Sequence, residues 1–271
     1  MKLLQLIADS GGTKTDWYGL NNEKKQLFFT TESYHPSTID EDFIKRQQIF
    51  WKNYDVSDCQ LKFYGSGCLK DDKKQLLKSI LEKLGFPSPS VESDLFAAYK
   101  ALKTTPEMIA ICGTGSVLFK VENEQITELR GGLGWDKGDE GSGSYFGKLL
   151  IERLGDNKSA CPEIFEQINQ WRPFEELIEM QNSIESKSIY SQLSYVLKDK
   201  TESPFLIEIH RKNINLFFDL YCNNINSISI VGSYAFYLKS YFEEACKLRN
   251  IELLEVVERP IIEIYKDFIN S

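Results

Sequence analysis

Short apolar runs that end in glycine turns occur at two places along the chain. Residues 3–8 form the first run, which stops at Asp9-Ser10-Gly11-Gly12. A second run, 107–112, stops at Gly113-Thr114-Gly115-Ser116. A short apolar run bounded by turn residues predicts a buried strand. In both places two further β-branched or aromatic segments follow, so the pattern strand, glycine turn, strand, strand occurs twice.

The same patterns predict the remaining elements and the class of fold. The predicted strands are 3–8, 15–20, 26–31, 61–64, 90–93, 107–112, 117–121, 125–129, 227–231 and 251–257. Helical spacing predicts helices at 41–51, 71–84, 95–102, 142–154, 235–248 and 261–268, with several more between 162 and 226. Strands that alternate with helices indicate an α/β protein.

The distance between the two glycine turns indicates how the domains are arranged. The turns lie roughly one domain length apart, since domains commonly run about 100 residues. We expect an N-terminal domain over 1–104, joined by the C-terminal helix 260–271. A second domain over 105–259 would carry a helical insertion.

Composition narrows the kinds of partner. The 271 residues are 42% hydrophobic and 27% charged, which is ordinary for a globular protein. A net charge of −8 without a basic block argues against a nucleic-acid partner. No apolar run reaches membrane-spanning length, and the first residues do not resemble a secretory signal. The six cysteines have no metal or redox spacing, which favours a reducing compartment. We therefore expect a cytoplasmic protein.

The first glycine turn has the composition of a phosphate-binding turn. Gly11 and Gly12 let the backbone approach a ligand closely, and the hydroxyls of Thr13 and Thr15 suit phosphate oxygens. Asp9, at the strand end, is placed to hold a hydrated Mg²⁺. The spacing is not that of a Walker loop, because a strand follows the turn. A plain β-hairpin is the alternative.

The second glycine turn and a later corner repeat this chemistry. Thr114 and Ser116 add hydroxyl donors to the turn formed by Gly113 and Gly115. The corner Gly232-Ser233, between a strand and a helix, lets a flat ring or a phosphate lie against the backbone. Two such turns after buried strands predict a polyphosphate ligand.

Two further sites carry carboxylates. Asp94 follows a short strand and precedes a helix, which places it as a general base, although Ser93-Asp94 is also a good helix N-cap. Six of the thirteen residues from 131 to 143 are glycine, a density typical of close backbone approach to a ligand. Asp139 and Glu140 in this loop either serve a sugar site or complement the dipole of the next helix.

Taken in order, these motifs resemble the N-acetylglucosamine kinase and BadF/BadG-type ATPase family of the sugar kinase, heat-shock ATPase and actin superfamily. The resemblance covers most of the chain and is most specific at Gly138-Asp139-Glu140-Gly141-Ser142. It implies two ribonuclease-H-like domains with a nucleotide cleft between them. It also implies ATP-dependent phosphorylation of an amino sugar, most simply N-acetylglucosamine, at the 6-hydroxyl. A homodimer is usual for these kinases.

The resemblance also assigns roles to residues. Asp94 matches the general base, and Asp9 would hold Mg²⁺. The residues implied to bind ATP are Gly11, Gly12, Thr13, Lys14, Thr15, Gly113, Thr114, Gly115, Ser116, Gly232 and Ser233. The residues implied to bind the sugar are His35, Asp94, Gly132, Gly134, Asp139 and Glu140. His35 stands where these kinases carry a sugar-binding asparagine, which affects the identity of the sugar more than the fold.

Two other functions are compatible with the same motifs. An activator ATPase of the BadF/BadG type would need cysteines in glycine-rich loops to bridge an iron–sulfur cluster, and Cys112 fits that role poorly. A non-catalytic protein that binds sugar or nucleotide is the third reading. The presence of Asp9, Asp94 and both glycine turns argues against it.

Overall fold

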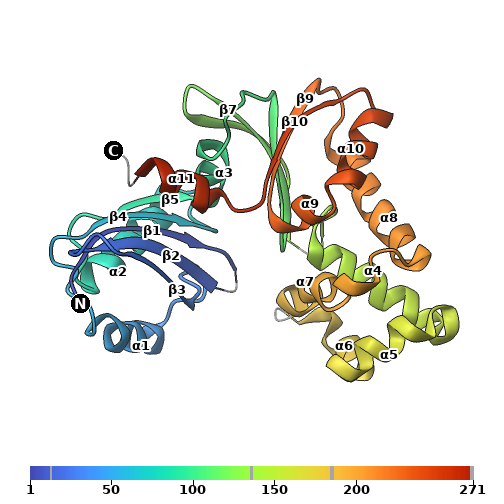
Figure 1. Ribbon diagram of the computed structural model, residues 1–271, viewed down its shortest axis with the longest axis horizontal. Helices are drawn as coiled ribbons and strands as arrows, with labels where there is room; N and C mark the ends of the chain where they lie inside the picture. Colours follow the sequence, from blue (N-terminus) through green and yellow to red (C-terminus); the bar gives the residue numbers. More distant parts are fainter. Residues whose placement is uncertain (13, 135–136, 184–185, 269–271) are drawn as a thin grey trace. The chain divides into compact units, whose positions relative to one another are not determined.

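Each of two units of the chain is built on a five-stranded mixed sheet (Figure 1). The computed structural model describes residues 1–12, 14–134, 137–183 and 186–268. Unit 1 comprises Met1–Ala101 with Arg259–Ser271, and unit 2 comprises Leu102–Glu258.

The sheet of unit 1 has the order β3-β2-β1-β4-β5. Its strands are β1 (Leu3–Ser10), β2 (Lys14–Asn21), β3 (Gln26–Glu32), β4 (Gln60–Gly65) and β5 (Ser90–Ser93). The first three strands form an antiparallel meander, and β4 and β5 add to β1 in parallel. Parallel neighbours bring the carboxyl ends of β1, β4 and β5 to one edge, where ligands of open α/β sheets bind.

Helices cover both faces of this sheet. They are α1 (Glu41–Trp51), α2 (Asp71–Lys83), α3 (Asp94–Lys100) and α11 (Pro260–Phe268). Figure 1 shows α1 and α2 on one face, with α3 and α11 on the other. Trp17 of β2 is fully buried under α1, and its ring packs edge-on against Trp51 with centroids 4.9 Å apart. Helix α11 is tied to β2 where the Tyr265 hydroxyl donates to the Gly19 carbonyl at 3.1 Å.

The sheet of unit 2 repeats this arrangement, with the order β10-β9-β6-β7-β8. Its strands are β6 (Met108–Cys112), β7 (Ser116–Glu122), β8 (Gln125–Gly131), β9 (Ser227–Val231) and β10 (Glu252–Val257). Again three strands form an antiparallel meander, and two strands add to the first in parallel. The twofold pattern seen in the sequence is therefore a repeat of topology.

Helices occupy the described part of unit 2 between β8 and β9. They are α4 (Gly143–Asp156), α5 (Pro162–Trp171), α6 (Phe174–Glu179), α7 (Ser186–Val196) and α8 (Pro204–Tyr221), with short 3₁₀ turns at Lys158–Ala160, Met180–Asn182 and Lys198–Lys200. Their apolar faces join β6 and β9 in one core. The helical patterns predicted for this stretch are confirmed. None of the helices in the described ranges is both long and apolar enough to cross a membrane.

One predicted helix differs from the structure. The segment predicted as a single helix over 235–248 is two helices, α9 (Ser233–Tyr237) and α10 (Lys239–Leu248). The backbone of Leu238 leaves the helical region there, and its side chain is buried in the core. Apolar spacing alone does not reveal this break, because Leu238 at the break is itself buried, as Ala235 and Phe242 are.

The two sheets with helices confirm the predicted fold class, α/β with two ribonuclease-H-like units. In each unit the glycine turn joins the first and second strands of the meander. The fold therefore places each turn beside the carboxyl ends of the parallel strands.

Candidate active site

Asp9 and Asp94 lie close together at the carboxyl edge of the unit 1 sheet. The register aligns Ser10 of β1 with Gly65 of β4, and Gly65 with Ser93 of β5. Asp9 therefore comes one residue before the aligned residues Ser10, Gly65 and Ser93, and Asp94 comes one residue after them. Asp94 is the first residue of α3. The structure thus brings together two carboxylates that are 85 positions apart in the sequence.

The environment of Asp9 favours its neutral form. Burial is the main cause that raises the pKa of its carboxyl to about 7, and the negative charges of Asp94 and Asp16 add to the effect. A divalent cation would relieve this repulsion. The described residues contain no group of three or more histidine, cysteine or acidic side chains that could hold a metal by themselves. A single carboxylate such as that of Asp9 is the kind of protein ligand that suits Mg²⁺ when phosphate and water supply the other ligands.

The first glycine turn is open around its glycines. A Cβ atom on Gly11 would meet nothing closer than 3.9 Å, and one on Gly12 would meet nothing within 4 Å. The backbone N–H of Gly11 donates to the Lys14 carbonyl at 3.0 Å, which closes the turn. Thr13 lies outside the described residues. This open backbone is what the approach of a phosphate group requires.

Two predicted ligands of the first turn have partners within the protein. The Thr15 side chain is buried, and its hydroxyl donates to Ser10 Oγ at 2.8 Å. The Lys14 ammonium pairs with both carboxylate oxygens of Asp16 at 2.9 Å on the exposed side of β2. In this state the Thr15 hydroxyl is used within the protein, and Lys14 must leave Asp16 before it can contact a ligand.

His35 packs against the turn that follows β4. Its Nδ1 lies 2.7 Å from the Ser37 hydroxyl. A Cβ atom on Gly67, whose φ is +79°, would come within 2.7 Å of His35 Nε2. The neighbouring Ser66 N–H donates to the Ser10 carbonyl at 2.8 Å, so this turn is fixed to the end of β1. His35 thus lies beside the edge that carries Asp9, and its contact with a sugar stays a prediction.

The second glycine turn lies against the corner predicted to bind adenosine. Ile111 of β6 aligns with Val231 of β9. The residues that follow them in the chain, Cys112 and Gly232, are therefore neighbours. Gly232 has φ of +127°, and a Cβ atom there would stand 2.5 Å from the Cys112 carbonyl oxygen. Only glycine permits this approach. Gly113 is open, with nothing within 4 Å of a Cβ position, and Ser233 begins α9 at the same corner.

The glycine-rich loop is joined to the second turn. Ser116 Oγ donates to the Glu140 carbonyl at 2.6 Å, and the Ser116 N–H donates to Asp139 Oδ1 at 3.3 Å. The N–H groups of Gly143 and Ser144, in the first turn of α4, donate to the carbonyls of Gly113 and Thr114. The Asp139 side chain is only 3% exposed. Burial raises the pKa of its carboxyl, and Lys187 partly opposes that shift.

Helix α8 supports the same loop from its other side. The Tyr221 hydroxyl donates to Glu140 Oε2 at 2.7 Å. Asn213 accepts from the Gly141 N–H at 2.7 Å and donates to the Ser142 carbonyl at 2.8 Å. Gly141 has φ of +83°, and a Cβ there would stand 2.8 Å from the Phe217 ring. Gly132 and Gly134 also have positive φ. Trp135 and Asp136 lie outside the described residues.

Sequence reasoning missed the residues that hold this loop. Lys187, Asn213 and Tyr221 come from α7 and α8, and they contact residues 48 to 81 positions earlier in the chain. No local motif marks them. A polar residue among the apolar positions of a helix is a signal that could have pointed to them. Asn213 of α8 is such a residue, since it is polar and fully buried.

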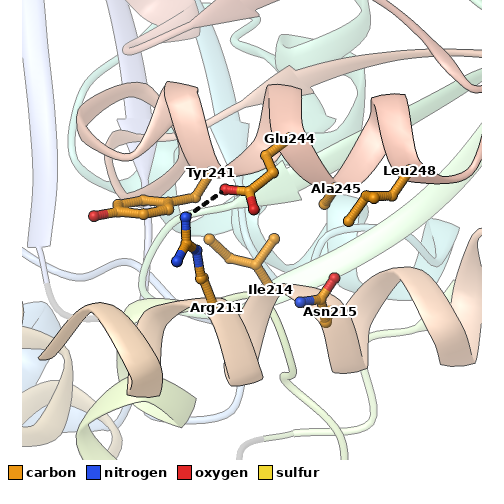
Figure 2. Close-up of a pocket in the computed structure, with 7 residues that line it drawn as sticks. All are labelled: Arg211, Ile214, Asn215, Tyr241, Glu244, Ala245 and Leu248. Carbon is orange, nitrogen blue, oxygen red and sulfur yellow. Dashed lines mark hydrogen bonds and ion pairs between the residues drawn. The ribbon is translucent and has the colours of Figure 1, made fainter. Parts of the chain in front are cut away.

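A small pocket elsewhere on unit 2 contains none of these residues. Figure 2 shows Arg211, Ile214 and Asn215 of α8 facing the side chains of α10. The Arg211 guanidinium pairs with Glu244 at 2.9 Å across it. With about 10 Å³ of free space it holds no more than a water molecule, so it is a packing gap between helices.

Several solved structures share this fold. A candidate N-acetylglucosamine kinase from Porphyromonas gingivalis is 24% identical with a TM-score of 0.83, and the match covers 99% of both chains. One from Chromobacterium violaceum is 15% identical with a TM-score of 0.66 and 96% coverage of both chains. A ROK family glucokinase from Streptomyces griseus, in complex with glucose and AMPPNP, is 14% identical with a TM-score of 0.57, over 96% of this chain and 95% of that one.

These likenesses establish the class of fold. The chain has the same fold as these solved structures, in agreement with the two ribonuclease-H-like domains that the resemblance implied. No model of a known protein family matches the sequence, and no curated protein matches it. Function therefore has to be argued from the fold together with the site.

Proposed function

We propose that this chain is an ATP-dependent kinase that phosphorylates an amino sugar, N-acetylglucosamine in the first instance, at its 6-hydroxyl. The observation that carries the proposal is the pair Asp9 and Asp94, set together at the carboxyl edge of the unit 1 sheet. A phosphoryl transfer to an alcohol needs a metal-binding carboxylate and a base beside it. The structural neighbours described as sugar kinases support the same chemistry.

In this proposal Asp94 accepts the proton of the sugar hydroxyl while the hydroxyl oxygen bonds to phosphorus. ATP supplies the phosphoryl group and leaves as ADP. Asp9 would hold Mg²⁺ through its carboxylate, and the two glycine turns, at Gly11-Gly12 and at Gly113–Gly115, bind phosphate oxygens. The corner at Gly232 and Ser233 lies against the adenosine. Exclusion of water by the protein keeps the phosphoryl group from hydrolysis.

The sugar contacts follow the same proposal. His35, Gly132, Gly134, Asp139 and Glu140 bind or surround the sugar. Glu140 is largely buried and already accepts a bond from Tyr221, so it serves by fixing the loop. We also propose that the protein acts as a homodimer in the cytoplasm.

The iron–sulfur alternative finds no support in the cysteine of the second turn. Cys112 is fully buried, and burial raises the pKa of its thiol well above the ordinary value. A buried, protonated thiol is a poor ligand for a cluster that bridges two subunits.

A coupled ADP-release assay tests the proposal. The sugar panel is glucosamine, N-acetylglucosamine, N-acetylmannosamine, N-acetylmuramate and glucose, with Mg²⁺-ATP fixed. We expect N-acetylglucosamine to stimulate ADP release most. The 6-deoxy form of N-acetylglucosamine should bind without being phosphorylated, because it lacks the acceptor oxygen. ATP hydrolysis that no sugar stimulates would instead indicate an ATPase, and binding without turnover a non-catalytic protein.

A further inference from the structure

The ammonium group of Lys187 lies over the second glycine turn. Lys187 is in the first turn of α7, and its Nζ stands 3.1 Å from Asp139 Oδ2. A Cβ atom on Gly115 would be 2.9 Å from the same Nζ. The ammonium therefore occupies the space that any other residue at position 115 would fill with its own side chain.

Asp139 holds this ammonium from the buried side. The Asp139 side chain is 3% exposed, whereas that of Lys187 is 39% exposed. Asp139 Oδ2 is buried, and its ion pair with Lys187 compensates its negative charge. An ammonium group has three donors in a compact head. One is directed to Asp139, and the exposed part of the group remains accessible to a ligand.

The turn itself offers donors beside this charge. In the described part of the chain, the backbone N–H groups of Thr114 and Gly115 donate to no acceptor, while the Gly113 N–H is used within the turn. Thr114 is exposed. Successive free N–H groups with a positive charge next to them form a site for an anion with several oxygens, such as a phosphate.

The position of the adenosine corner indicates which phosphates are involved. Gly232 contacts the Cys112 and Gly113 end of the turn, whereas Lys187 lies at its Gly115 end. A nucleotide with its adenosine at Gly232 would extend its phosphate chain along the turn toward Lys187. The group that reaches Lys187 is then a terminal phosphate and not the α-phosphate.

We propose that Lys187 binds the terminal phosphates of the nucleotide, and that Asp139 is the counter-ion that positions it over the Gly113–Ser116 turn. This inference rests on the proposed function, because it assumes that the turn binds ATP. It assigns to α7, a helix without a recognisable motif, the cation that the second glycine turn, Gly113–Ser116, does not provide from its own sequence.

The test is equilibrium binding of AMPPNP, ADP and AMP with Mg²⁺, measured by calorimetry. Lys187→Met should weaken AMPPNP binding about ten- to a hundredfold, the effect of one charge-assisted hydrogen bond. AMP binding should change by less than about twofold, within the ordinary effect of a surface substitution. Lys187→Arg should keep most of the affinity because it retains the charge. Lys212→Met, which removes an exposed lysine of α8, is the matched control and should bind all three nucleotides normally.

The outcomes distinguish a failure of the role proposed for Lys187 from a failure of the proposed kinase function. If wild-type protein binds no adenine nucleotide, both fail. If wild type binds and phosphorylates but Lys187→Met binds AMPPNP normally, only the role of Lys187 fails. An equal loss for AMPPNP and AMP would also overturn it, since that pattern indicates general damage to the site. If the unpaired Asp139 carboxylate unfolds Lys187→Met, the double variant Lys187→Met/Asp139→Asn removes both charges and takes its place.

Discussion

The Ser93 hydroxyl caps helix α3 by accepting a hydrogen bond from the backbone N–H of Leu95 at 3.1 Å. Asp94, the next residue, is already inside the helix, and its Oδ1 also lies 3.1 Å from the Leu95 nitrogen. The sequence left open whether Asp94 is a cap or a base. Because the Ser93 hydroxyl accepts from the same N–H group, a cap remains when Asp94 is changed, and chemistry and stability can be tested on adjacent residues.

Asp94→Asn should lower kcat by about 10²- to 10⁴-fold, the usual contribution of a general base. The fold should survive, because Ser93 still caps α3 and Asn has nearly the shape of Asp. Ser93→Ala is the matched variant. It should cost about 0.5–2 kcal/mol of unfolding free energy, as loss of a helix cap does, while keeping most of the turnover. Steady-state kinetics and urea unfolding measure the two effects. Near-normal turnover by Asp94→Asn would remove the base assignment.

Asp9→Asn should abolish most Mg²⁺-dependent turnover and leave sugar binding nearly unchanged. The reason is that in the proposed mechanism Asp9 holds the metal, whereas its neighbour Asp94 accepts the proton of the sugar hydroxyl. The same substitution should raise thermal stability, because it removes a poorly solvated charge that Asp94 and Asp16 repel. Mg²⁺ titrations of activity, sugar calorimetry and thermal melts give the three readouts. Unchanged Mg²⁺ dependence would show that Asp9 has a structural role and that the first turn does not bind the metal.

Much of the fold was predictable because its signals are local. A buried run followed by a glycine turn marks β1 and β6, and the recurrence of that pattern predicted two units that the sheets confirm. The apolar spacing from residue 71 predicted α2 to within one residue. Gly85, with φ of +101°, follows the C-cap Leu84 and ends that helix.

The support of the site was not predictable because it depends on distant pairs. Asn213 holds Gly141 from 72 positions away, and Tyr221 holds Glu140 from 81. Nothing in the sequence around either residue indicates this role, because the contact forms only when the chain folds. The hydroxyl of Thr15 illustrates the opposite error, since its residue type suits phosphate but its side chain points into the core. Residue type and spacing therefore identify where a ligand would approach, but not which side chains face it.

Gly147→Ala should destabilise unit 2 and weaken AMPPNP binding together. Helix α7 crosses α4 so closely at Gly147 that a Cβ there would overlap the Tyr190 carbonyl oxygen. Forcing the helices apart should cost about 1–3 kcal/mol, the usual range for overpacking, and would move Lys187 away from the turn.

Gly155→Ala in the same helix is the control for Gly147→Ala. Its Cβ would meet nothing closer than 3.8 Å, and alanine in a helix gains about 0.5–1 kcal/mol over glycine. We therefore expect opposite signs for the two variants in urea unfolding, with nucleotide affinity reduced only in Gly147→Ala. Equal stability for both would show that α7 adapts without strain.

His210 should make the protein lose stability as the pH falls from 6.5 toward 3. Burial lowers the pKa of its ring to about 3, well below the ordinary value of 6.5. The ring stacks on Phe146 with centroids 3.9 Å apart, and Nδ1 meets the Tyr234 hydroxyl at 2.9 Å, with Tyr241 beyond it. These neighbours are uncharged at neutral pH, so nothing among them compensates a protonated ring.

The direction of this change in stability with pH follows from how many protons the folded and unfolded chains bind. Between pH 6.5 and about 3 the unfolded chain takes up a proton at this histidine and the folded chain does not, so each pH unit removes about 1.4 kcal/mol of stability. His210→Gln should be less stable than wild type at pH 7, because it loses the ring stacking, but its stability should fall less steeply with acid. Urea unfolding at pH 7, 5.5 and 4.5 measures both slopes. His35→Gln, which removes the other histidine of the chain, is the control and should keep the steep slope. Parallel curves for wild type and His210→Gln would show that His210 is protonated in the folded protein and that its burial does not shape the acid response.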